Sequence, residues 1–382
     1  MKRLNGEGTW GTKVIKGYKY NFFRDSNGHY VYGKTIKAVK EKYAEYQKKQ
    51  FTIDNHTTFG EYIQHWLKIK NKVLEATTYD CYETMIDSQI LHFKVYDIAN
   101  KKLEDLSPKI FQSYLDALAT QYSRATIKKI WVIIKQCIKY GEIENVIPQN
   151  CAALVKVPLE SQVAVKKKEI PFLSFDEANK LYDTLSMTYS NGTPRFKENA
   201  HALILMMYSG ARISEILALK WKNVDIENQL IYIEESIAEK KNRDKKSKNK
   251  YITYNKTPKN THSIRKIPLP KRGLEMIEYF NKKNPNHKSN DYVCITSNKT
   301  HMMRRNVNKT LKSMLKMAKI PNCSAHTLRH TYGSILLQNG VEIKKVSELL
   351  GHNNISTTYD IYIGILEKDK ATEVERVFDK NE

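Results

Sequence analysis

Apolar and polar positions alternate at the start of the chain and then give way to a helical pattern. Residues 10–15 and 18–23 have a period of two, which predicts two β-strands. Asn27 and Gly28 follow them, and this dipeptide supplies the positive φ angles of a tight hairpin turn. Residues 35–49 contain no Gly or Pro and many helix formers. The pattern predicts a small three-stranded sheet with one helix.

Residues 57–154 carry the spacing of amphipathic helices. Thr58 and Glu61 form a capping-box pattern, in which each side chain satisfies a backbone amide of the other residue. The apolar positions that follow predict one buried face, formed by Phe59, Tyr62, Ile63, Trp66 and Leu67. This segment predicts an all-α helical bundle.

Serine residues mark two further helix starts in this segment. Ser107 precedes Pro108, which suits the first helical turn because its missing N–H would be unpaired there anyway. Ser123 is predicted to cap a later helix, and Gly141 is predicted to end it. Lysines surround the apolar part of that helix, at Lys128, Lys129, Lys135 and Lys139. A solvated face is the default explanation of these lysines, and a contact with DNA is the alternative.

A change of pattern near residue 156 indicates a linker and a further domain. Residues 156–170 show no sustained period, and they include Pro158 and a run of three lysines. Ser174 and Glu177 then form a second capping-box pattern, which predicts the start of a new helix. The boundaries that we expect are 1–54, 55–157 and 171–382, with a linker at 158–170.

A lysine-rich block interrupts the β-like pattern of the third domain. Two runs with strand character flank residues 240–250, and the self-repulsion of this block disfavours its burial. We expect a long basic hairpin, or a loop that becomes ordered on DNA. The whole third domain is predicted to be mixed and mainly α, with this hairpin as an insertion.

The net charge adds a polyanionic partner to this picture. Lys and Arg number 64 among 382 residues, against 41 Asp and Glu, so the formal charge is +23. Nucleic acid and an anionic membrane surface would both attract a protein with such a surplus of positive charge. No apolar run approaches the roughly 20 residues of a membrane-spanning helix, and the N-terminus lacks a signal-peptide pattern. We therefore expect a soluble, cytoplasmic protein.

The cysteines argue against disulfides and zinc. They are scattered along the chain without a CxxC pair, at Cys81, Cys137, Cys151, Cys294 and Cys323. Buried thiols in a reducing cytosol are the expectation.

One arginine occupies a position suited to binding phosphate. Arg212 follows Gly210 closely, at the opening of a helix whose apolar side includes Ile213 and Ile216. Its planar guanidinium can donate two parallel hydrogen bonds to phosphate oxygens and stays charged at any relevant pH. The alternative is an ion pair with Glu215.

Two later motifs carry further candidate chemistry. His326 and Arg329 are three residues apart, so they are neighbours on one helical face and could address one phosphate together. Gly351 is predicted to end a helix in the left-handed conformation, directly before His352. Tyr362 stands ten residues beyond that histidine.

The order of these motifs resembles the tyrosine recombinase (phage integrase) family across most of residues 170–370. The resemblance implies that a phosphate would be surrounded by Arg212, His326, Arg329 and His352. Tyr362 would attack it, and Tyr359, three residues earlier, is the competing nucleophile. The family's active-site lysine normally lies on a β-hairpin, where Lys259 is the expected residue and Lys266 the alternative.

The resemblance also implies an activity and its partners. It indicates an integrase of a phage or an integrative conjugative element, which integrates and excises DNA through a covalent 3′-phosphotyrosine intermediate. Two strand transfers conserve the bond energy, so no cofactor and no metal are expected, in agreement with the absence of a P-loop pattern. The expected partners are arm and core DNA sites, three further copies in a tetramer on DNA, an excisionase and a host DNA-bending protein.

The upstream modules and the tail have looser assignments. The N-terminal sheet would bind arm sites, with a minor folding module as the alternative, and the helical domain would bind the core site. The tail from Leu366 would dock on a neighbouring subunit or on its own domain. A type IB topoisomerase-like enzyme and a catalytically silent DNA-binding regulator remain as rival functions.

Overall fold

The computed structural model describes residues 8–363, apart from residues 16, 26–27, 50–52, 55, 167–170, 245–246, 248 and 258–262. Contacts within the chain divide it into two compact units, Met1–Lys167 and Lys168–Glu382. The predicted tail from Leu366 lies outside the described residues. Within the described residues, no helix combines the length and apolar character needed to cross a membrane.

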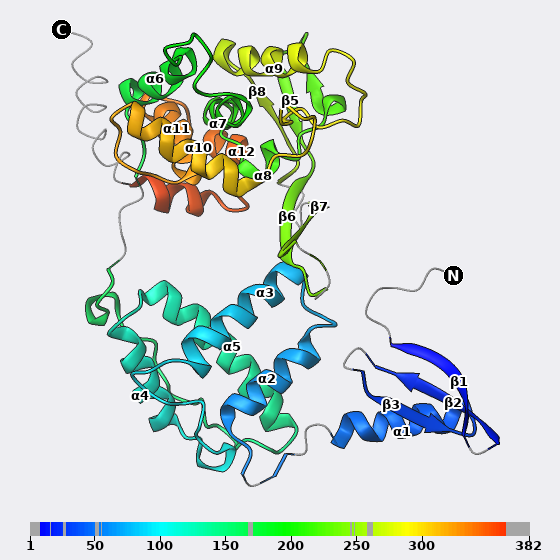
Figure 1. Cartoon of the computed structure of the whole chain (residues 1–382). Coiled ribbons are helices and arrows are strands. Elements are labelled where there is room, and N and C mark those ends of the chain that lie inside the picture. Colours follow the sequence, from blue (N-terminus) through cyan, green and yellow to red (C-terminus); the bar gives the residue numbers. More distant parts are fainter. Residues whose placement is uncertain are drawn as a thin grey trace. The chain divides into compact units, whose positions relative to one another are not determined.

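The first unit begins with the predicted sheet and helix. Its strands are antiparallel in the order β1-β2-β3. The elements are β1 (Thr9–Ile15), β2 (Tyr18–Arg24), β3 (Tyr30–Gly33) and α1 (Ile36–Lys49), and α1 packs on β2 and β3 (Figure 1). The hairpin between β2 and β3 is confirmed, with Gly28 at a φ of +86°. The connection spans residues 25–29, so the hairpin loop is longer than a two-residue turn.

The rest of the first unit is the predicted helical bundle. Its main helices are α2 (Phe59–Lys70), α3 (Ala76–Met85), α4 (Pro108–Ala119) and α5 (Arg124–Ile143). The capping box of Thr58 and Glu61 is confirmed, and the five apolar residues predicted for one face of α2 are buried. Tyr114 and Trp66 are among the largest fully buried side chains, because they fill the space between these helices.

Two details of the bundle differ from the prediction. The α5 helix does not end at Gly141 but continues to Ile143. Gly141 is a packing residue, because a Cβ there would lie 2.6 Å from the Ile147 Cδ1 atom. Ser107 and Ser123 occupy the N-cap positions, but neither side chain accepts a hydrogen bond from a backbone amide of its helix; the Ser123 hydroxyl lies 3.2 Å from the Thr126 hydroxyl instead.

The cysteines partly follow the prediction. Cys137, Cys151 and Cys294 are buried free thiols, and Cys323 is half-buried. Cys81 is exposed on α3, so the expectation of buried thiols is wrong for this residue.

The second unit is built around α7 (Glu198–Ser209). This helix is buried on several faces, in keeping with its largely apolar sequence, and α9, α10 and α11 all pack against it. The surrounding helices are α6 (Phe175–Asp183), α8 (Ile213–Ile216), α9 (Lys271–Lys283), α10 (Arg304–Met317), α11 (Ala325–Gln338) and α12 (Ile343–Leu350). The capping box of Ser174 and Glu177 at the start of α6 is confirmed. Residues 355–363 form a further helical segment.

The described residues of the second unit also form five strands. A small antiparallel sheet has the order β4-β5-β8, formed by β4 (Val224–Asp225), β5 (Leu230–Ile233) and β8 (Arg265–Pro268). The expected basic hairpin is present as β6 (Ser236–Lys241) paired with β7 (Tyr251–Lys256), and it projects from the helices of this unit (Figure 1). A polar network fixes its base, where Lys220 Nζ lies 2.8 Å from a Glu235 carboxylate oxygen.

Candidate active site

The first candidate arginine stands where two helices meet. Gly210 ends α7 with a φ of +64°, and Arg212 is the N-cap residue of α8. A side chain at Gly210 would collide with Tyr332, so glycine allows α11 to approach. The ion pair considered as an alternative is present, because Arg212 Nη1 lies 2.7 Å from Glu215 Oε1. The arginine is therefore held in place while remaining partly exposed.

Glu215 joins two arginines. Its second oxygen, Oε2, lies 2.8 Å from Nη2 of Arg265 on β8, and the Glu215 residue is only 5% exposed. Burial raises the pKa of this carboxyl, but the charges of Arg265 and Arg212 outweigh burial and lower it to about 2. Glu215 is thus a carboxylate at any physiological pH and fixes both guanidinium groups.

Arg329 is almost completely buried, with 1% of its surface exposed. Its Nη1 donates to the carbonyl oxygen of Gly210 at 2.9 Å, and its Nη2 donates to the carbonyl oxygen of Leu350. Arg329 therefore ties together the ends of α7 and α12. Burial, followed by the nearby charge of Arg212, lowers the pKa of this guanidinium to about 9, which still leaves it charged at neutral pH.

Two histidines lie side by side on α11. His326 is exposed at the start of the helix, and His330 is 6% exposed one turn later. Their ring centroids are 4.5 Å apart in an edge-to-face arrangement. Partial desolvation of its ring, followed by the charge of Arg329, lowers the pKa of His326. Burial and His326 lower the pKa of His330 to about 4, so the His330 ring is neutral at neutral pH.

The last two predicted residues follow α12. Gly351 ends this helix with a φ of +66°, as predicted, and His352 comes next. The Nδ1 atom of His352 lies 2.8 Å from the Thr358 hydroxyl, and burial together with Arg329 lowers its pKa to about 3. Tyr362 is 2% exposed, and burial raises its pKa to about 12 although Arg329 acts in the opposite direction.

The two candidate tyrosines have different surroundings. The Tyr362 hydroxyl lies 3.5 Å from Nδ1 of His330, inside the second unit. Tyr359, three residues earlier in the same helical segment, is 42% exposed. The structure therefore separates the tyrosine inside the cluster from the one on the surface.

The candidate lysines are not part of the described cluster. Lys259 lies outside the described residues. Lys266 is described on β8, and its Nζ lies 5.5 Å from the centroid of the Tyr232 ring. Successive side chains of a strand point to opposite faces, and Arg265 points to Glu215. The neighbouring Lys266 consequently faces away from the arginine cluster.

Two residues of the cluster had no predicted role. Arg265 lies within the segment considered for the lysine, and His330 directly follows Arg329. A basic residue beside a motif is the only signal that the sequence offers for either. Their importance depends on partners that are distant in sequence, namely Glu215 and Tyr362.

The described charges define what the cluster can bind. The three guanidinium groups of Arg212, Arg265 and Arg329 outnumber the single carboxylate of Glu215, and the neighbouring imidazoles have lowered pKa values. The cluster therefore carries a net positive charge at neutral pH. Such a desolvated cationic site favours an anion such as a phosphodiester.

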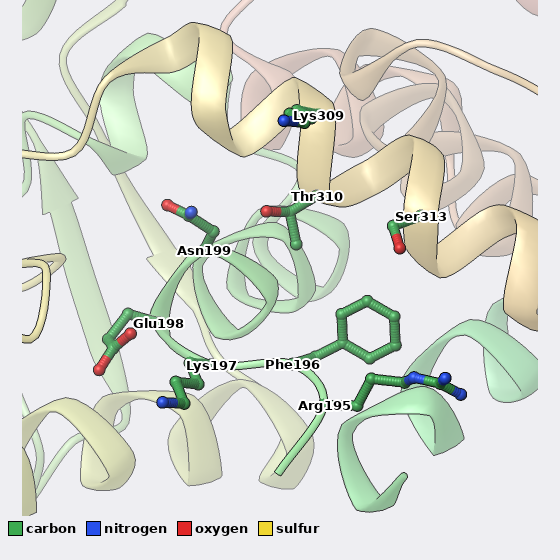
Figure 2. Close-up of a pocket in the computed structure, with 8 residues that line it drawn as sticks. All are labelled: Arg195, Phe196, Lys197, Glu198, Asn199, Lys309, Thr310 and Ser313. Atoms are coloured by element: carbon green, nitrogen blue, oxygen red, sulfur yellow. The ribbon is translucent and has the colours of Figure 1, made fainter. Parts of the chain in front are cut away.

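A pocket elsewhere in the second unit contains none of these residues. A cavity of about 390 Å³ lies between the start of α7 and α10, and Figure 2 shows Lys309, Thr310 and Ser313 of α10 facing it. Glu198 also lines it, and its carboxylate pairs with Lys283 at 3.3 Å. None of the residues singled out by the sequence motifs lines this pocket, so the arginine cluster is kept as the candidate active site.

The chain is similar to known proteins along most of its length. Residues 171–368 match the phage integrase family, and residues 58–119 match the phage integrase N-terminal SAM-like domain. The chain is 29% identical to a "Tyrosine recombinase XerC-like" protein of Caldanaerobacter subterraneus subsp. tengcongensis, over 93% of this chain and 94% of that protein. It is 26% identical to the integrase of Staphylococcus phage L54a, over 81% of this chain and 90% of the integrase.

Solved structures show the same fold. The Tn1549 transposon integrase, in complex with transposon right end DNA, matches with a TM-score of 0.64 and 17% identity, over 80% of this chain and 94% of that one. A lambda integrase tetramer bound to a Holliday junction matches with a TM-score of 0.54 and 15% identity, over 94% and 96%.

Proposed function

This chain belongs to the phage integrase family, and from that premise we propose that Tyr362 is the nucleophile with which it breaks and rejoins DNA. As a tyrosine recombinase, the protein cleaves and rejoins DNA by transesterification. The observation that carries the assignment to Tyr362 is the burial of its hydroxyl within the electrostatic reach of Arg329. The competing Tyr359 lacks this environment.

The chemistry is a pair of phosphoryl transfers. The Tyr362 oxygen bonds to phosphorus as the bond from phosphorus to the 5′ oxygen breaks; the phenol loses its proton and the 5′ oxygen gains one. A 5′ hydroxyl of the partner strand later attacks the 3′-phosphotyrosine and releases the tyrosine. Arg212 and Arg329 offset the charge that builds on the non-bridging oxygens. His326 and His352 hydrogen-bond these oxygens.

Lys259 is the proposed acid for the departing 5′ oxygen. The support for it is the resemblance of its sequence setting to the family's hairpin lysine. The orientation of Lys266 away from Glu215 and Arg265 is a second reason to prefer Lys259.

The other modules suit a mobile element. Residues 1–54 would bind arm sites, residues 55–157 the core site, and residues 171–382 would carry the chemistry. Two relatives support integration and excision: a phage integrase, and a transposon integrase solved with transposon end DNA. The lambda integrase tetramer on a Holliday junction supports assembly of four copies on DNA. The protein would act in the cytoplasm, with an excisionase and a host DNA-bending protein as accessory factors.

Covalent trapping tests this proposal. The full-length chain is incubated in EDTA with nicked duplexes that tile the DNA flanking its own gene, and adducts that survive denaturation are recovered. We expect an adduct from the wild type and from Tyr359→Phe, and none from Tyr362→Phe. Loss of the adduct only in Tyr359→Phe would move the nucleophile by about one helical turn, and no adduct from bound wild type would contradict the proposal.

A further inference from the structure

His330 and Gly333 form the surroundings of the Tyr362 hydroxyl. Both belong to α11, three residues apart, and they therefore lie on one face of the helix. Nδ1 of His330 is 3.5 Å from the hydroxyl oxygen, and the two rings meet edge to face with centroids 6.1 Å apart. A Cβ added to Gly333 would lie 2.3 Å from the same oxygen. Glycine thus makes room for the hydroxyl beside the imidazole.

The rest of the Tyr362 side chain is fixed by apolar contacts. It belongs to a small buried cluster with Leu337, Val346 and Leu350. These contacts hold the ring but offer the hydroxyl nothing to bond with. Among the described residues, His330 provides the polar atom within hydrogen-bonding distance of that hydroxyl.

We propose that His330 is a positioning residue whose Nδ1 accepts a hydrogen bond from the Tyr362 hydroxyl and sets the direction from which this nucleophile attacks. The proposal rests on the proposed role of Tyr362. It extends the site beyond the six residues that the motif order indicates. A small displacement of a nucleophile can cost about 100-fold in rate, so a single bond of this kind can matter for catalysis.

The protonation state of His330 agrees with an acceptor role. The groups that face it are His326 and Arg329 on its own helix, with Tyr362 and His352 from the segment after α12. Burial, His326 and Arg329 lower its pKa to about 4. A neutral imidazole keeps one nitrogen as an acceptor, whereas a protonated one has two donors. Its contribution is therefore constant above about pH 5 and is lost as the pH falls through 4.

The test uses the full-length chain and the nicked duplex that gives the wild-type adduct. Single-turnover cleavage rates and DNA affinities are measured for His330→Ala, His330→Asn and Gly333→Ala. The matched control is His201→Ala, a histidine of α7 that stacks on Tyr279. We expect a cleavage rate about 10- to 100-fold lower in His330→Ala, partial recovery in His330→Asn, which keeps an acceptor, and an unchanged affinity.

Gly333→Ala provides an independent perturbation. Alanine favours a helix by roughly 1 kcal/mol over glycine, so a general loss of folding is not expected from the backbone. The added methyl group should push the hydroxyl away from His330 and lower the cleavage rate about as much as His330→Ala does. The double variant should then be no slower than either single variant, because both remove one interaction.

Three results would overturn the inference while leaving Tyr362 as the nucleophile. They are a wild-type cleavage rate in His330→Ala, an additive loss in the double variant, and a rate that falls in proportion to DNA affinity or thermal stability. The pH dependence of the cleavage rate gives a further test. If the wild-type rate fell between pH 8 and pH 6 and the rate of His330→Asn did not, His330 would not be a neutral acceptor in this range. Failure of the wild type itself to form an adduct would instead reject the proposed function.

Discussion

Glu215 sets the balance of charge in the candidate site. It is buried between Arg212 and Arg265, with an oxygen committed to each. The carboxylate stabilises two cations that would otherwise repel each other and Arg329. The site therefore keeps a dense positive charge for phosphate without three unpaired guanidinium groups near one another.

Replacing this carboxylate should destabilise the second unit. Glu215→Gln removes the charge that offsets Arg265, which is itself nearly buried, and should lower the free energy of unfolding by about 3 kcal/mol. Urea unfolding of the full-length chain, followed by circular dichroism, measures this loss. Glu198→Gln is a matched control, because its partner Lys283 is 44% exposed, and the expected loss is below about 1 kcal/mol. Equal losses in both variants would contradict this view of Glu215.

The same residue predicts a pH dependence. Its folded pKa of about 2 lies below the ordinary value of 4.5, so its stabilising contribution is fully present above about pH 5. This contribution is lost progressively as the pH falls from there toward 2. The difference in unfolding free energy between wild type and Glu215→Gln should shrink over that window, and a constant difference down to pH 3 would argue against a charged Glu215.

Some residues of the site were predictable from sequence and others were not. Arg212, Arg329 and Tyr362 are marked by motif order, and the structure places all three in one electrostatic cluster. Arg265 and His330 acquire their contacts only when distant elements meet, so no local spacing identifies them. The sequence suggested two alternative roles for Arg212, as a phosphate ligand or as an ion-pair partner. The structure shows the ion pair, and the Arg212 side chain is still partly exposed.

At the level of elements, the sequence predicted a helix end correctly where glycine adopts the left-handed conformation. It predicted one wrongly where glycine is required by the packing of a neighbouring side chain. Gly351 has the left-handed conformation that its position after Leu350 predicts. Gly141, in contrast, lies inside α5, and its missing side chain leaves room for Ile147. A glycine in a helical pattern is consistent with both roles, and only the tertiary neighbour distinguishes them.

Gly351 should be intolerant of substitution for two reasons. A Cβ there would be strained by the φ of +66° and would lie 3.0 Å from Arg265. Gly340 is a matched control, since its φ is +79° but nothing lies within 4 Å of the added carbon. Gly340→Ala should cost about 1 kcal/mol of stability, whereas Gly351→Ala should cost more and also slow DNA cleavage. Equal stability and cleavage in the two variants would rule out the Arg265 contact as the cause.

Capping residues of the bundle allow a second comparison between elements. Thr58 accepts from the Glu61 amide, whereas Ser107 occupies an N-cap position without such a bond. Thr58→Ala should therefore lower the free energy of unfolding by about 1 kcal/mol, and Ser107→Ala by less than half of that. Thermal unfolding of both variants measures the difference. A larger loss in Ser107→Ala would show that its hydroxyl caps α4 after all.

At the scale of the whole molecule, the surplus of positive charge governs how DNA is bound. The charge of +23 belongs to both units, and the basic strands β6 and β7 extend part of it away from the body of the second unit. Contacts between lysine and phosphate release counterions, so affinity must fall with salt. We expect the affinity of the full-length chain for its duplex to drop by about 1,000-fold or more between 50 and 200 mM salt.

Substitution of one lysine tests how much the β6–β7 hairpin contributes to the salt dependence of DNA affinity. Lys250 is exposed beside β7, and a phosphate contact there would contribute about one unit to the slope of log affinity against log salt concentration. Lys250→Gln should reduce the slope by that amount, while Lys282→Gln, at an exposed position on α9, should leave it unchanged. An unchanged slope in Lys250→Gln would mean that this lysine does not meet the backbone. Since a phosphate contact carries no base information, the reduction should be the same on specific and non-specific duplexes, which separates a contact that anchors the DNA from one that reads its sequence.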